Sequence, residues 1–216
     1  DEELIKKTTP WVEWALNSQK PNGYFGPDTD YPNLPGVQRD NAADWWPRMV
    51  VLKFLEQYYS VTKDERVIAL MTNYFKYQLE TLPEKPLDNW TFWAKYRGGD
   101  NLMMVYWLYN ITGDEFLLDL AEILHEQTFD FTHSLLETDM IRDNEPIHCV
   151  NLVQGIKEPA VYYQHHPDDK YINAIKKGIA DLEEFSGQPQ GLFGGDEVLR
   201  TQNPIYGTVV CTTVEY

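Results

Sequence analysis

A glycine-rich loop late in the sequence carries two adjacent carboxylates. It reads Gly191-Leu192-Phe193-Gly194-Gly195-Asp196-Glu197 and follows a long amphipathic stretch that ends near Phe185. Hydrolysis of a glycosidic bond uses one protonated carboxylic acid and one nucleophile or base. Because glycines let the backbone approach a ligand closely, a loop of this kind can desolvate Glu197 enough for it to hold its proton. By composition alone, a solvated pair of loop carboxylates is the favoured interpretation. A phosphate cradle is excluded, since the G-x-G-x-x-G spacing and a following Lys are both missing.

Polar side chains also precede three apolar helical stretches. Asp44 and Asp100 would cap helices in the simplest interpretation, because Asp is a preferred N-cap residue. Capping does not explain Arg48 and His148 at matching places. The three segments are Asp44-Trp45-Trp46-Pro47-Arg48, Arg97-Gly98-Gly99-Asp100-Asn101 and His148-Cys149-Val150-Asn151.

Four of the seven tryptophans lie in or beside these segments, namely Trp45, Trp46, Trp90 and Trp93. A sugar ring has an apolar C–H face that an indole can cover and hydroxyls that polar side chains can bind. Ordinary core packing is the alternative for any single Trp. As a set, the segments predict sugar binding, with Trp45, Trp46 and Trp93 stacking. The predicted hydroxyl ligands are Arg48, Asp100, Asn101, His148 and Asp196.

The elements that must position these residues are helices, and they repeat. Three apolar stretches with helical spacing cover residues 49–59, 101–109 and 150–163, and each precedes a second helical stretch. A Tyr stands five residues before an Asp at the end of each: Tyr59/Asp64, Tyr109/Asp114 and Tyr163/Asp168. The offsets of 50 and 54 residues indicate repeated helix pairs.

Long loops enter the first helix of each pair: residues 19–44, 82–99, 137–148 and 187–208. An open solenoid would have shorter connections. We therefore predict an all-α fold, an (α/α) toroid of helical hairpins, formed by a single domain over residues 1–216. The loops would gather at one mouth, where the polar segments begin.

Composition limits the partners. The chain has 216 residues and a formal net charge of −16, from 18 basic and 34 acidic residues. Such a surface repels phosphate backbones and anionic lipid, and no apolar run reaches the length of a membrane helix. The expected partner is an oligosaccharide, with neither nucleic acid nor membrane. Cys149 and Cys211 form no C-x-x-C motif, and a bridge between them is allowed but not implied.

The sequence resembles a bacterial branch of the β-L-arabinofuranosidase-like glycoside hydrolases, which include glycoside hydrolase family 127, over nearly its whole length. The resemblance implies an (α/α)6 barrel and a retaining hydrolase that releases L-arabinofuranose or a related rare sugar from plant-type glycans. It is carried by Asp44-Trp45-Trp46-Pro47-Arg48-Met49, Thr91-Phe92-Trp93-Ala94-Lys95-Tyr96-Arg97-Gly98-Gly99-Asp100-Asn101, His148-Cys149-Val150-Asn151, Gly195-Asp196-Glu197 and Gly207-Thr208-Val209-Val210-Cys211.

The resemblance also implies residue roles. Glu197 lies where the family has its acid/base glutamate, and His148 matches a substrate-contacting histidine. Cys211 matches the first cysteine of a zinc site whose thiolate is the nucleophile. The expected glutamate ligand is replaced by Val209, and the family's adjacent cysteine pair is absent. The chain therefore resembles an internal section of a longer member, with the rest of the barrel or another protomer as partner. Its substrate class predicts a periplasmic or extracellular location, with a cytoplasmic one still allowed.

Two other functions fit the residues. A zinc-independent toroid enzyme acting on unsaturated uronides would use Asp44, Asp100 and His148. A non-catalytic carbohydrate-binding fragment would fit the incomplete zinc set. We expect the first function, a glycoside hydrolase with Glu197 as its acid/base.

Overall fold

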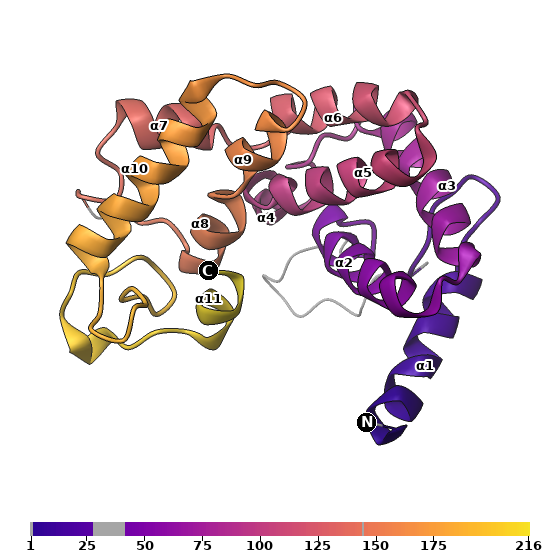
Figure 1. Ribbon diagram of the computed structural model, residues 1–216, viewed down its shortest axis with the longest axis horizontal. Helices are drawn as coiled ribbons and strands as arrows, with labels where there is room; N and C mark the ends of the chain where they lie inside the picture. Colours follow the sequence, from indigo (N-terminus) through magenta and orange to yellow (C-terminus); the bar gives the residue numbers. More distant parts are fainter. Residues whose placement is uncertain (1, 28–41, 144) are drawn as a thin grey trace. The chain divides into compact units, whose positions relative to one another are not determined.

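Helices account for most of the structure, a computed structural model that describes residues 2–27, 42–143 and 145–216 (Figure 1). These residues hold helices and isolated bridges but no β-strand, which confirms the predicted all-α fold. In the same residues, no helix combines the length and apolar character that a membrane span requires. The helices of ten or more residues are α1 (Glu2–Asn17), α2 (Trp45–Thr62), α3 (Glu65–Thr81), α5 (Gly98–Thr112), α6 (Phe116–Gln127) and α10 (Asp169–Ser186). The shorter ones are α4 (Phe92–Tyr96), α7 (Phe131–Glu137), α8 (Cys149–Gly155), α9 (Glu158–Tyr163), α11 (Val210–Glu215) and the 3-10 helix η1 (Pro204–Tyr206).

The chain divides into two compact units, and unit 1 comprises Asp1–Lys95 and Met103–Gln127. In it, α3 packs against α1, α2 and α6. The hairpin between α2 and α3 follows the predicted turn. Lys63 takes a left-handed conformation (φ 55°) after α2, and Asp64 caps α3 by accepting a hydrogen bond from the Arg66 N–H. The second repeat is similar, because Gly113 (φ 72°) ends α5.

Unit 2 comprises Tyr96–Leu102 and Thr128–Tyr216. Here α10 packs along α7 and α9, and α11 packs against α8 (Figure 1). Asp168 caps α10 as the turn motif predicts, by accepting from the Lys170 N–H. The apolar core draws side chains from α7, α8 and α10 and from the loop after α10. Its members include Phe131, Leu135, Leu152, Val153, Ala174, Leu182, Phe193 and Leu199.

The predicted continuous helix over residues 150–163 is wrong, because the segment forms two helices, α8 and α9. Pro159 lies in the first turn of α9. Proline lacks the N–H that a helix interior needs, and it is favoured in the first turn. The break at Ile156 and Lys157 therefore follows from one residue that the apolar periodicity does not register.

The loop of residues 187–208 connects α10 to the last helix without forming a strand. Isolated bridges fold it on itself, between Gly187 and Phe193 and between Gly195 and Leu199. A third bridge joins Val198 to His148, at the start of α8. The loop is thus attached to the helix start that the sequence analysis singled out.

Candidate functional site

His148 and Glu197 come together in unit 2, as expected for two site residues 49 positions apart in the chain. His148 is the N-cap of α8, where its Nδ1 accepts a long hydrogen bond from the Asn151 N–H at 3.4 Å. Its Nε2 lies 3.2 Å from Oε2 of Glu197. With Nδ1 as acceptor, the proton of the neutral imidazole belongs on Nε2, where it donates to the carboxylate. The imidazole therefore orients the Glu197 side chain.

Backbone hydrogen bonds hold the same two segments in register. The Cys149 N–H donates to the Glu197 carbonyl at 3.2 Å, and the Leu199 N–H donates to the Ile147 carbonyl at 3.0 Å. The Glu197 side chain nevertheless points outward and is 86% exposed. The interpretation of Glu197 as a solvated loop carboxylate therefore holds, and the desolvated one is wrong, because Gly195 and Leu199 are buried while the Glu197 side chain stays in solvent. What the loop provides is a fixed and accessible carboxylate.

Asp196 has a different role from its neighbour. Its Oδ1 lies 3.0 Å from Nε of Arg200, and it also accepts from the Val198 N–H. The hydrogen bond from Arg200 lowers the pKa of Asp196 below its ordinary value. Asp196 is therefore an ionised anchor within the loop, and its predicted contact with sugar stays a prediction.

Gly195 packs directly against the thiol of Cys149. A Cβ built on Gly195 would lie 2.4 Å from Sγ of Cys149 and 3.4 Å from its Cβ. Only the sulfur therefore excludes a side chain at position 195. The glycine allows the Glu197 loop to lie flush on the start of α8.

This contact predicts a rescue. Gly195→Ala is expected to destabilise the chain by about 2 kcal/mol, because the new methyl group overlaps a buried sulfur atom. In a Cys149→Ala background the same change meets ordinary van der Waals space and costs clearly less. Denaturant unfolding of the four members of this double-mutant cycle measures the coupling. Additive effects of the two changes would contradict the packing described here.

Asp100 is not a helix cap, so the capping interpretation is wrong for this residue. Helix α5 begins earlier, at Gly98, which places Asp100 inside the first turn with only 1% exposure. Its Oδ1 lies 2.8 Å from Nζ of Lys157, and its Oδ2 accepts from Nε2 of Gln154 at 3.0 Å. Asn101 beside it is fully buried. Both residues are enclosed within unit 2, so neither offers an accessible group to a sugar hydroxyl in this structure.

A second buried contact joins the turn before α5 to α8. Nε of Arg97 donates to Oδ1 of Asn151 at 2.8 Å, and both residues are at most 4% exposed. Sequence reasoning missed this pair, the Asp100–Gln154 pair and Lys157. A signal was present, because both pairs are separated by 54 residues, the offset between the second and third repeats. Equivalent positions of successive repeats therefore touch.

Two of the expected sugar contacts in unit 1 are structural instead. Trp45 is 1% exposed and its indole N–H donates to the Lys85 carbonyl, so core packing is the correct interpretation. Arg48 is 3% exposed and donates to three backbone carbonyls, which occupy its guanidinium. The acceptors are Phe25, Asp44 and Ala42.

The remaining candidate site residues of unit 1 are Asp44, which caps a helix, and Trp46 and Trp93, which are partly exposed. Asp44 caps α2 by accepting from the Trp46 N–H, so the capping interpretation holds for it. Trp46 and Trp93 are half-buried and meet edge to face, with ring centroids 5.3 Å apart. An exposed Phe92 extends this aromatic cluster next to Trp93. Trp46 and Trp93 remain predicted sugar-stacking residues.

The residues present do not fit the zinc site that the resemblance implies. Cys211 is exposed on α11, and Val209 precedes that helix as its N-cap residue without a side-chain hydrogen bond. Within residues 2–27, 42–143 and 145–216, no group of three His, Cys, Asp or Glu side chains could hold a metal ion. Cys149 is a free, buried thiol, and burial raises its pKa to about 12. It is therefore a neutral packing group at neutral pH.

The two thiols should differ sharply in reactivity. A thiolate is the reactive form, so Cys211 is expected to react rapidly with Ellman's reagent at pH 8 while Cys149 stays protected. Titration should count one thiol in the native chain and two in denaturant. Cys211→Ser should abolish the native signal, and Cys149→Ala should leave it in place. Two fast thiols in the native chain would contradict the burial of Cys149.

Comparison with known proteins gives one match. The sequence model of a family described as "Beta-L-arabinofuranosidase, GH127 catalytic domain" matches residues 1–188. The matched segment includes His148 and the buried pairs of unit 2, and it ends nine residues before Glu197. Neither the curated proteins nor the solved structures contain a match to the chain.

Proposed function

The chain belongs to the β-L-arabinofuranosidase family of GH127 catalytic domains, and on that premise we propose that it releases L-arabinofuranose or a related rare sugar from plant-type glycans with retention of anomeric configuration. Membership of this family makes it a glycosidase. The catalytic domain of the family is an α/α toroid, which agrees with the helical hairpins of the structure. The single predicted domain over residues 1–216 stays a prediction.

One observation carries the proposal: Nε2 of His148 lies 3.2 Å from an exposed carboxylate oxygen of Glu197. A retaining reaction needs a nucleophile that bonds to the anomeric carbon while the bond from that carbon to the leaving-group oxygen breaks, and no described residue is assigned that role. Glu197 in its protonated form gives its proton to the leaving-group oxygen in this step. Water then displaces the nucleophile from the sugar, and Glu197 takes a proton from this water. His148 is a positioning residue, since its N–H fixes one carboxylate oxygen and leaves the other for substrate.

No step is assigned to zinc, because the described residues do not fit such a site. Cys149 is a poor candidate for the nucleophile, since it is buried and protonated at neutral pH. In unit 1, the half-buried rings of Trp46 and Trp93 support a role in stacking on sugar. The uronide alternative loses support, because Asp100, which it needs as a reacting group, is enclosed and paired with Lys157.

The test is sugar release from two panels of oligosaccharides, one with L-arabinofuranosyl ends and one with unsaturated uronide ends. Proton NMR identifies the released sugar and the anomer that forms first, which reports retention or inversion. Each reaction is run with added zinc and with a chelator. We expect arabinose release with retention. Release from the uronide panel alone, inversion, or no release under any condition would overturn the proposal.

A further inference from the structure

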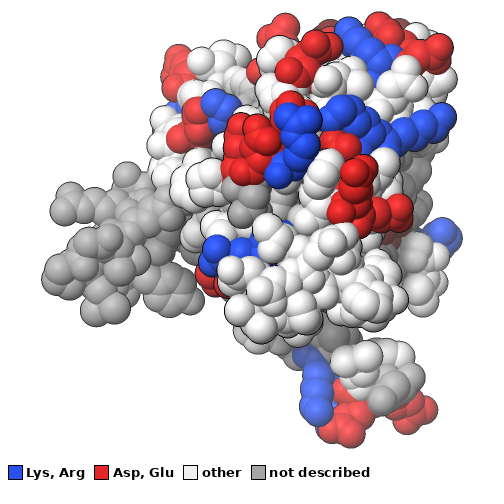
Figure 2. All heavy atoms as spheres, turned by 90° about the vertical axis from the view of Figure 1, so that its left-hand side faces the viewer, with Lys and Arg blue, Asp and Glu red and all other residues white. Residues whose placement is uncertain are grey.

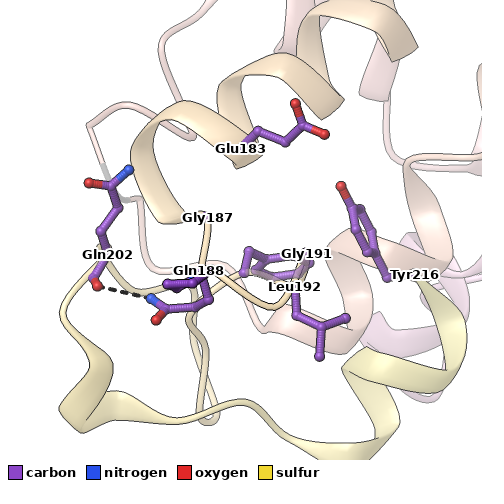
Figure 3. A pocket seen from close by; sticks show the side chains of 9 residues that line it. Glu183, Gly187, Gln188, Gly191, Leu192, Gln202 and Tyr216 are labelled. Carbon is purple, nitrogen blue, oxygen red and sulfur yellow. Dashed lines mark hydrogen bonds between the residues drawn. The ribbon is translucent and has the colours of Figure 1, made fainter.

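The loop of residues 187–208 forms a cavity that is distinct from the His148–Glu197 pair. Its volume is about 560 Å³, within the range of pockets that bind small ligands. It lies between the end of α10, the first turn of this loop and α11 (Figure 3). The lining includes Glu183, Gln188, Leu192, Phe193, Gln202 and Tyr216, and none of these is a candidate site residue.

Polar groups at this cavity are available to a ligand. Gln188 uses its Nε2 to donate to the Gln202 carbonyl at 3.0 Å, which leaves its Oε1 to accept another hydrogen bond. Glu183 and the Tyr216 hydroxyl form no hydrogen bond or ion pair with other described residues. Figure 3 shows the carboxylate and the hydroxyl on the same side of the cavity, directed toward one another. Burial and the nearby Glu183 charge raise the pKa of Tyr216, which keeps its hydroxyl a donor.

Apolar groups complete the lining. Tyr216 is 42% exposed and meets Phe193 edge to face, with centroids 5.3 Å apart. Leu192 also lines the cavity and is drawn beside Tyr216 in Figure 3. An aromatic ring with a neighbouring leucine can cover the C–H face of a sugar, while amide and carboxylate oxygens accept from its hydroxyls.

The charge of the cavity selects against anions. Glu183 is the only charged residue among those lining it, and no Lys or Arg is present there. Figure 2 shows the face of the molecule that lies on the left in Figure 1. Charged side chains of both signs gather on its upper part, while the region below, where Figure 1 places the loop of residues 187–208, is mostly uncharged. Phosphates, sulfates and uronates are therefore unfavourable ligands.

We propose that this cavity is a second binding site for a neutral oligosaccharide, which holds a glycan chain near the catalytic loop. The inference rests on the proposed glycan substrate. Phe193 lines the cavity, and Glu197 follows it by four residues in the same loop. A glycan bound in the cavity would therefore keep its other sugar units at high local concentration near Glu197. This gain in local concentration would be larger for oligomers than for single sugars.

The experiment measures binding without turnover, in the Glu197→Gln chain with 15N labelling. The probes are a neutral L-arabinofuranose trisaccharide and a galacturonic acid trisaccharide of the same length. We expect the neutral probe to shift the backbone amide signals of the non-proline residues within 187–192 and the anionic probe to bind at least about tenfold more weakly. Glu183→Gln should reduce the difference in affinity between the neutral and the anionic probe.

Three variants control the result. Tyr216→Ala should weaken binding of the neutral probe at residues 187–192 about tenfold. Tyr216→Phe keeps the ring and should retain most of the affinity, as should Tyr163→Ala, which lies outside the cavity. Shifts confined to the neighbourhood of His148, equal binding of the two probes, or unchanged affinity in Tyr216→Ala would each overturn the inference. Sugar release plays no part in this assay, so the proposed reaction and this site can fail independently.

Discussion

Glu197→Gln is expected to lower kcat/KM on an arabinofuranoside with an alcohol leaving group by about 10³-fold. A leaving alkoxide needs a proton, and general acid catalysis of this kind contributes about 10²–10⁴-fold. The amide of Gln keeps the size of the side chain and the contact with His148, so the fold should survive. The measurement is steady-state release of arabinose by the purified variant beside the unchanged chain. Glu137→Gln, an exposed change on α7 in the same unit, is the matched control and should be neutral.

One further substrate and an added nucleophile distinguish loss of acid catalysis from a general loss of activity. An aryl arabinofuranoside with an acidic phenol needs little proton donation, so its cleavage should suffer far less than that of the alcohol glycoside. Azide, which needs no general base, should then accelerate the variant by forming the glycosyl azide. Equal losses on both substrates, or no response to azide, would show that Glu197 acts in some other way.

Lys157→Met is expected to reduce the free energy of unfolding by about 3 kcal/mol, because it leaves the buried carboxylate of Asp100 without its cation. Burial alone would lower the pKa of Lys157, but attraction to Asp100 and a hydrogen bond to it raise the pKa above the ordinary 10.5. The folded chain therefore favours the charged amine. This stabilisation is fully present below pH 10.5 and is lost as the pH rises above that value.

Urea unfolding at neutral pH measures this effect. Lys177→Met is the matched control, since it removes a more exposed ion pair with Asp181 on the surface of α10 and should cost well under 1 kcal/mol. The double variant Lys157→Met/Asp100→Asn removes both charges and should be more stable than Lys157→Met alone. A loss no larger than that of the control would contradict the assignment of a buried ion pair.

Local signals in the sequence predicted local structure well. The Tyr-to-Asp turns mark where Asp64 and Asp168 cap the second helices of their pairs, and the apolar periodicity identifies α2 and α5. The prediction that His148 and Glu197 share a site came from the resemblance and from residue types. The structure places the two side chains 3.2 Å apart, and the site and their catalytic roles remain proposals.

The direction in which a side chain points was beyond the sequence. Glu197 and Asp100 are both acidic residues that follow a Gly-Gly pair within two positions, yet one is in solvent and the other is enclosed. The difference depends on where α5 begins and on Lys157, which lies 57 residues after Asp100 and carries no motif of its own. Likewise, the Arg48 guanidinium donates hydrogen bonds to three backbone carbonyls. The positions of these carbonyls depend on the path of the backbone, which residue types alone do not specify.

The pairs Arg97–Asn151 and Asp100–Gln154 tie the turn and helix starts of two successive repeats at the same spacing. A shift of α8 by one residue relative to α5 would rotate its side chains by about 100° and break both pairs together. The two pairs therefore fix the phase of α8 relative to the start of α5. In descendants of this sequence, a substitution at 97 should be accompanied by one at 151, and a substitution at 100 by one at 154.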